Sequence, residues 1–285
     1  MCKLRYYLSL FLLLQGTFLV ADSINDNPTP EIPKSQYFIS LRRNQGRTVG
    51  NKDSYSTVEA LSFPFHQNNL WPFLDLRFHH LDSSGKSAVN AGLGIRYIPD
   101  YTDLILGFNA YYDLRNSHRK HFNQCGLGLE FLGRCWSFRL NGYLPFGKRT
   151  FLDSFCHNTY PGGYFLLREN FIDSLAGANF EIESLIRRFC WGEIYGALGS
   201  YYYKGNKCQG DIYGTEYRLT AWFCNQFTFD INATHDCLYK TRILAQLTFT
   251  IPLKSGWETN PRLYQRVRRH EIVVLNKHSL WTSNF

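Results

Sequence analysis

The stretch from Asp113 to His121 (Asp-Leu-Arg-Asn-Ser-His-Arg-Lys-His) combines an acid, a serine and two histidines. Hydrolases use these residue types when a base activates a hydroxyl nucleophile. Nothing in the spacing fixes a nucleophile beside its base, and the same types are common in charged surface loops. We therefore expect no enzyme activity. A hydrolase with His118 or His121 at its site is the weakest of the three functions that we consider.

Metal chemistry has equally little support in the sequence. His79 and His80 are neighbours, but a strand points successive side chains to opposite faces, so the two cannot bind one ion. His118 and His121 fall in the charged loop, and the chain has no CxxC or CxxH cluster of the kind that holds zinc. We expect no metal and no other cofactor.

The chain opens with the pattern of an export signal. Lys3 and Arg5 give a positive start, residues 8–14 are an apolar stretch, and Ala21 is a small residue at a suitable cleavage site. We expect residues 1–21 to be removed, and the alternative is a retained N-terminal anchor helix. Residues 22–45 contain three closely spaced prolines and are expected to form an irregular periplasmic leader.

Seven cysteines follow the predicted signal, and export makes disulfides possible. An odd number leaves at least one thiol free or available to another molecule. Cys208 and Cys237 fall in neighbouring predicted loops, so they are candidates for a bridge. The spacing does not decide between this bridge and free thiols.

The elements that carry these residues alternate strictly between apolar and polar positions. In residues 103–114, Leu106 and Phe108 share one face of a strand, whereas Asn109 and Asp113 share the other. The same pattern predicts twelve strands, at 46–50, 55–65, 71–82, 88–98, 104–114, 122–132, 136–146, 177–185, 194–203, 213–223, 227–234 and 242–251. One long irregular stretch, 147–175, interrupts them.

An exported chain with twelve such segments fits an all-β, antiparallel transmembrane β-barrel of outer-membrane type. The barrel would span residues 46–253, with an apolar face toward lipid and a polar face toward the lumen. Paired glycines on the polar face favour a lumen, where aromatic rings or a second backbone need space. The alternative is a soluble β-sandwich that packs its apolar faces together.

The predicted lumen contains charged residues at positions that the strand register relates. If the last three strands are joined by short turns, Arg218, Asp230 and Arg242 should form a ladder across them. Four acids from other strands should also face inward, namely Glu130, Glu181, Glu183 and Glu216.

Positive charge is concentrated near the end of the chain. The formal net charge is +8, and residues 254–285 alone hold six basic and two acidic residues. Nucleic-acid binding is a poor explanation for an exported chain. We expect this basic tail to thread through the lumen, where Arg262, Arg266, Arg268 and Arg269 would meet the four acids. The alternative is a free basic tail in the periplasm.

Four motifs occur in the order in which one known family has them. They are Gly107–Asp113 (Gly-Phe-Asn-Ala-Tyr-Tyr-Asp), Gly126–Glu130 (Gly-Leu-Gly-Leu-Glu), Asn141–Tyr143 (Asn-Gly-Tyr), and Tyr264–Arg269 followed by Glu271–Lys277. Together they resemble the β-domain of the intimin/invasin family, the inverse autotransporters. The resemblance covers residues 46–277.

This resemblance implies a twelve-stranded outer-membrane barrel whose C-terminal segment leaves through the pore and carries an adhesive passenger. The sequence departs from the family pattern at Arg269-His270, where the family has Asn-Asn. It ends eight residues after Lys277, so we expect no passenger. Residues 22–45 are also too few for the peptidoglycan-binding module of some members.

The first function that we expect is a structural or surface protein derived from a translocator domain, with a role in cell adhesion. The second is a porin-like diffusion channel, and the third is the barrel hydrolase. The expected location is the bacterial outer membrane, reached through the cleaved signal. Expected partners are outer-membrane lipid, the barrel-assembly machinery, and host-cell or envelope proteins that contact the outer loops.

Overall fold

The computed structural model describes residues 35–67, 69–83, 86–100, 102–117, 120–159, 165–205, 210–223, 226–253 and 262–283. The predicted signal peptide, most of the predicted leader, His118 and Cys208 lie outside these residues.

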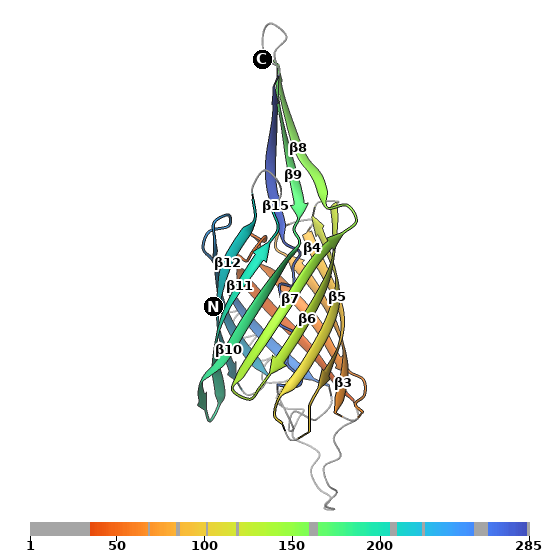
Figure 1. Ribbon diagram of the computed structural model, residues 1–285, viewed down its shortest axis with the longest axis vertical. Coiled ribbons are helices and arrows are strands. Elements are labelled where there is room, and N and C mark those ends of the chain that lie inside the picture. Colours follow the sequence, from red (N-terminus) through yellow and green to blue (C-terminus); the bar gives the residue numbers. More distant parts are fainter. Residues whose placement is uncertain are drawn as a thin grey trace, which may run out of the picture. The chain divides into compact units, whose positions relative to one another are not determined.

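Twelve antiparallel strands close into a barrel (Figure 1). They are β1 (Gln36–Gly46), β2 (Tyr55–Phe63), β3 (Leu70–Leu81), β4 (Lys86–Tyr97), β5 (Ile105–Ser117), β6 (Lys120–Leu132), β7 (Trp136–Phe146), β10 (Gly177–Phe189), β11 (Gly192–Tyr203), β12 (Ile212–Phe223), β13 (Phe227–Asp236) and β14 (Arg242–Pro252). Each strand pairs with its neighbour in sequence, except that β7 pairs with β10. The barrel closes where β1 pairs with β14, from Phe38 opposite Pro252 to Gly46 opposite Leu244.

The predicted strand number and barrel are therefore confirmed, but the first strand was placed too late. We expected it at 46–50, after an irregular leader, whereas β1 begins at Gln36. Its alternation is regular, because Phe38, Ser40 and Arg42 are buried between exposed neighbours. The nearby prolines and the adjacent pair Arg42-Arg43 hid this pattern, since one arginine faces the lumen and the other faces outward.

The two faces of the barrel have opposite chemistry. Large apolar side chains cover the outside, including Leu76, Leu93, Leu144 and Leu198, each more than half exposed. Polar and charged side chains fill the inside. A wide apolar outer surface and a polar interior are typical of strands that cross a membrane. Among the described residues, no helix is long and apolar enough to span a membrane.

Tryptophan side chains lie on both faces of the barrel wall. Trp136 and Trp191 are about half exposed on the outside, and Trp191 stacks between Phe189 and Phe223. Trp71 is buried inside the barrel instead. Trp222 also faces inward, because its ring lies below the guanidinium of Arg262.

The connections sort the barrel into two ends. Joins after β2, β4, β6, β10 and β12 share one end, which we call the turn end because it includes the tight hairpins 133–135 and 190–191. The other joins share the loop end. Most of these joins are longer, such as 47–54 and 204–211, but only residues 118–119 separate β5 from β6.

A second sheet extends from the loop end. The stretch expected to be irregular contains β8 (Thr150–Thr159) and β9 (Phe165–Ser174), which pair as a hairpin between β7 and β10. The third strand, β15 (Leu275–Ser283), pairs along β9 from Leu275 opposite Ser174 to Ser283 opposite Leu166. The end of the chain thus adds a strand to a loop far away in sequence (Figure 1).

Candidate functional site in the barrel lumen

Residues 262–274 lie inside the barrel, and we call them the lumen segment. Leu263 and Tyr264 pack at the turn end, where they join a buried apolar cluster with Trp71 and Leu132. Val274 packs at the loop end against Val49 and Leu175. The segment therefore runs through the pore from the turn end to the loop end and continues directly into β15.

The segment is neither helix nor strand, so its buried backbone needs partners from elsewhere. Side chains of the barrel wall supply them. Five wall side chains donate hydrogen bonds to its carbonyl groups. Arg96 donates to the carbonyls of Leu263 and Gln265, Arg77 to that of Val267, Asn141 to that of Arg268, Asn90 to that of Glu271, and Arg115 to that of Val273. The backbone N–H of His270 donates to the Tyr143 hydroxyl at 2.7 Å. These contacts come from β3, β4, β5 and β7, so one side of the wall specifies the path of the chain.

Three arginines of the segment bind wall carboxylates that we did not assign to them. Arg266 and Arg268 each donate to Asp230 at 2.9 Å. Arg269 makes two hydrogen bonds to Asp113, at 3.0 and 2.5 Å. Asp113 and Asp230 are 1% and 0% exposed, so both pairs are shielded from solvent.

The expected acids mostly bind other groups. Only Glu183 meets a tail arginine as predicted, because Arg262 donates to it at 2.8 Å. Glu181 accepts from Arg139 and Arg218, and Glu130 accepts from Arg96. Glu216 faces His270 at 3.1 Å. Alternation predicted the right faces of the strands, but the height of each residue in the barrel depends on the shear between strands, which alternation does not encode.

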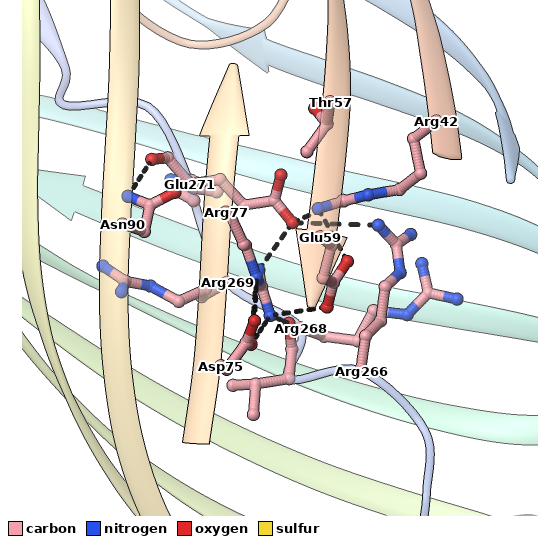
Figure 2. A network of polar contacts seen from close by, with 12 residues as sticks. Arg42, Thr57, Glu59, Asp75, Arg77, Asn90, Arg266, Arg268, Arg269 and Glu271 are labelled. Atoms are coloured by element: carbon pink, nitrogen blue, oxygen red, sulfur yellow. Dashed lines mark hydrogen bonds and ion pairs between the residues drawn. The ribbon is translucent and has the colours of Figure 1, made fainter. Parts of the chain in front are cut away.

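Glu271 is a central residue of the site that the sequence reasoning missed. Its carboxylate accepts from Arg42 at 2.6 Å and from Arg77 at 2.7 Å, as Figure 2 shows. The same two arginines also bind Glu59 on β2. The available signal was that Glu271 is the one acid among the basic residues of 262–277, and that the inward positions of two predicted strands carry arginine.

The expected ladder on the last strands is only half present. Arg218 lies 3.8 Å from Asp230, although their strands place Arg218 opposite Asn232 and Thr220 opposite Asp230. Arg242 was expected beside Asp230, but it lies opposite Thr234, and Gln246 lies opposite Asp230. Arg242 binds the carbonyl groups of Thr48, Asn51 and Tyr239 at the loop end. We assumed a β13–β14 turn close to the ends of both strands, whereas β13 continues to Asp236 before the turn.

Charges of the wall and the segment balance within this network. Among the described residues, eight wall carboxylates and five wall arginines form inward ion pairs, which leaves the wall three charges negative. The acids are Glu59, Asp75, Asp113, Glu130, Glu181, Glu183, Glu216 and Asp230, and the arginines are Arg42, Arg77, Arg96, Arg139 and Arg218. The lumen segment adds four arginines and Glu271, which is three charges positive. Buried carboxylates are stable only when such partners are present.

Apolar packing adds to the fit at the turn end. The Tyr264 ring lies 5.4 Å from the ring of Phe38 and 5.2 Å from that of Phe63, and it meets Trp71 edge-on at 6.0 Å. These wall residues are inward-facing and would contact water if the segment were absent. Two cavities beside the segment are small, at about 70 Å³ each.

The inward glycines provide the space that their pairing predicted. A Cβ on Gly126 would lie 2.5 Å from the guanidinium of Arg269, and one on Gly92 would overlap the ring of Tyr111. At the loop end, Gly50 has a φ of +65°, and a Cβ there would lie 2.8 Å from the Cα of Val274. Only glycine fits both that conformation and the close approach of the exit chain.

Of the residues considered for hydrolysis and metal binding, those that the structure describes do not assemble into one site. Asp113 is held by Arg269 in the lumen, whereas His121 is exposed at the loop end and contacts Asn116. His79 and His80 point to opposite faces, as expected, and His79 is bonded to Thr57 and Asn90. Over the ranges that the structure describes, no group of three His, Cys, Asp or Glu residues could hold a metal ion. Cys125, Cys135, Cys156, Cys190 and Cys237 are free cysteines.

Comparison with known proteins gives one family. Residues 39–156 match the family model described as the inverse autotransporter β-domain, which confirms the family resemblance. The match includes the first three motifs, whereas the fourth, at 264–277, lies outside it. A search of curated proteins gave no match.

Solved structures support the fold. A membrane protein solved in work on in-meso crystallization is 15% identical, with a TM-score of 0.62, over 85% of this chain and 100% of that chain. The β-domain of the Bordetella autotransporter BrkA is 9% identical, with a TM-score of 0.35, over 77% of this chain and 99% of that one. The translocator domain of NalP from Neisseria meningitidis is 10% identical, with a TM-score of 0.31, over 86% and 96%. The first shows a shared fold, and the other two are too distant to add to it.

Proposed function

We propose that this chain, whose residues 39–156 match the inverse autotransporter β-domain, is an outer-membrane translocator barrel held closed by its own exit segment. The lumen segment is the part of the chain that leaves through the pore, and β15 is its first stretch on the outside. In this role the barrel positions a chain across the membrane and prevents leakage around it.

The observation that carries the proposal is the fit between the wall and the lumen segment. An irregular chain inside a barrel is stable only when its backbone and charges find partners, and here wall side chains supply both. A diffusion channel would instead need a hydrated lumen. The apolar wall residues around Tyr264 argue against that second function.

The same proposal implies how the barrel reaches the outer membrane and how it is oriented there. The cleaved signal peptide delivers the chain to the periplasm, and the barrel-assembly machinery inserts it. The loop end and the β8–β9–β15 sheet face the cell exterior, where an adhesive role would involve host-cell or envelope surfaces. Outer-membrane lipid contacts the apolar outer face.

Conductance across planar bilayers tests the proposal. We expect refolded full-length protein to show little conductance, because the lumen segment fills the pore. Removal of residues 254–285 should produce steady open channels, since β14 ends at Pro252 and the barrel keeps all its strands.

A shorter truncation is the matched control. Removal of 275–285 takes away β15 but keeps the lumen segment, so this variant should remain closed. Equal conductance in the full-length protein and both truncations would favour the porin-like channel and contradict the proposal.

A further inference from the structure

A cavity of about 430 Å³ lies at the loop end, beside the point where the chain leaves the lumen. Its lining comes from five parts of the molecule. They are the loop 50–53, the loop-end residues of β4 and β5, Ile172 of β9, the β13–β14 connection with the first residue of β14, and the first residues of β15. None of these residues belongs to the network that holds the lumen segment by ion pairs.

The lining is strongly positive. It holds five cations, Lys52, Lys86, Arg115, Arg242 and Lys277, against one carboxylate, Asp53. Asp53 is bound to Lys86 at 2.7 Å, and Lys277 is bound to Asp153 outside the cavity. Positive charge therefore remains in excess around the cavity.

Arg115 is the clearest sign that something is missing from this cavity. It is 4% exposed, yet within the described part of the chain no carboxylate forms an ion pair with it. Its donors go to the carbonyl groups of Gly50 and Val273 and to the Asn51 amide oxygen. Its Nε–H is buried without a hydrogen-bond acceptor. A buried cation with neutral partners and an unused donor is costly unless an anion compensates for it.

Arg242 repeats the arrangement from the opposite side. It is 8% exposed and donates to the carbonyl groups of Thr48, Asn51 and Tyr239. The nearby Asp236 carboxylate accepts instead from the Tyr201 hydroxyl and the amides of Leu238 and Tyr239. Two buried guanidinium groups thus line one cavity, and among the described residues neither forms an ion pair with a carboxylate.

We propose that this cavity binds a phosphate group of a small ligand or of a lipid headgroup, with Arg115 and Arg242 at its base and Lys52 at its opening. Several cations around one space suit a multiply charged anion better than a single carboxylate. The volume limits the bound part to a phosphate with about one sugar ring.

Thermal unfolding and calorimetry on the refolded full-length protein test this site, with inorganic pyrophosphate as the probe. We expect pyrophosphate to raise the unfolding temperature, and acetate at equal ionic strength to leave it unchanged. Arg115→Gln and the exposed Lys52→Gln should each weaken pyrophosphate binding about tenfold, because each removes one charged contact. Because Lys52 is exposed, Lys52→Gln should fold normally and can test binding even if Arg115→Gln folds poorly.

The matched control is Lys204→Gln, an exposed lysine at the same end of the barrel that does not line the cavity. It should bind pyrophosphate like the wild type. Competition by lipopolysaccharide would identify a lipid headgroup as the source, and binding without such competition would identify a soluble phosphate. Equal affinity in the wild type, the control and both cavity variants, or no binding at all, would overturn the proposal.

Discussion

At the scale of single residues, the buried ion pairs of the lumen decide where the chain runs. Asp113 and Asp230 are almost completely shielded, and their closest cations come from the lumen segment. Such pairs contribute little compared with an apolar replacement of both partners, but removal of one partner leaves an uncompensated buried charge. The main effect of these pairs is therefore to favour one path of the segment through the lumen, and their net contribution to the free energy of unfolding is small.

The pair between Arg269 and Asp113 gives the sharpest test at this scale. We expect Arg269→Met to destabilise the folded barrel by about 3–5 kcal/mol, because the Asp113 carboxylate stays buried without its partner. The double variant Arg269→Met/Asp113→Leu should recover most of that loss. Urea titration of the barrel in lipid, followed by tryptophan fluorescence, measures both.

An exposed pair serves as the control. Arg43 and Asp82 are bonded at the loop end with side chains 45% and 44% exposed. Arg43→Met should destabilise the barrel far less than Arg269→Met, since water screens the charge that remains on Asp82. A similar cost for the two single variants would mean that Arg269 is not buried against Asp113.

Residue types were easier to predict than residue partners. Alternation in the sequence placed every expected lumen acid and Arg218 on the inward face, because that face depends only on a two-residue period. Partners such as Arg269 with Asp113 depend on barrel shear and on the height of an irregular segment, neither of which leaves a local pattern.

At the scale of elements, the added strand β15 holds the chain once it has left the lumen. It follows Val274 directly and pairs along β9. Asp153 lies at an irregularity of β8 and binds Lys120 of β6 at 2.6 Å and Lys277 of β15 at 2.9 Å. One carboxylate thus links the barrel, the hairpin and the exit strand.

This link should depend on pH. Burial alone would raise the pKa of Asp153, but hydrogen bonds from Lys120 and Lys277 hold that pKa below its usual value of 3.8. A lowered pKa means that the stabilisation is complete above the usual value and is lost as the pH falls below it. We expect hydrogen-exchange protection of β15 amides to fall between about pH 5 and about pH 3.

Asp153→Asn isolates this effect from other carboxyl groups of the sheet, such as Asp173. The variant should lose about two- to fivefold in β15 protection at pH 5 and show a smaller further change on acidification, as expected for a partly exposed pair. Asp82→Asn, which removes a distant exposed carboxylate, should behave as the wild type. An identical acid profile in wild type and Asp153→Asn would contradict the link.

Strands of the barrel were predictable, whereas the second sheet was not. The barrel strands alternate because one face meets lipid and the other meets the lumen. Strands β8, β9 and β15 have no such division, since exposed residues such as Phe155 and Trp281 lie on a sheet with no barrel interior. The pairing of β15 with β9 is also set by where the lumen segment ends, which the sequence around β15 does not show.

At the scale of the whole molecule, the barrel surrounds a segment of its own chain. The wall is negative and partly apolar, and the lumen segment is positive and carries matching apolar residues. The resemblance to the inverse autotransporters predicted a chain that leaves through the pore. Residues 39–156 match the β-domain of that family.

Photo-crosslinking from position 264 in intact cells tests most directly whether the lumen segment occupies the pore. Tyr264 would be replaced by p-benzoylphenylalanine, which keeps an aromatic ring at a site that contacts Phe38, Phe63 and Trp71. After irradiation, mass spectrometry should find crosslinks within the same chain to peptides of β1, β2 and β3. Crosslinks to other envelope proteins, with none to these three strands, would place the segment outside the barrel and contradict the account.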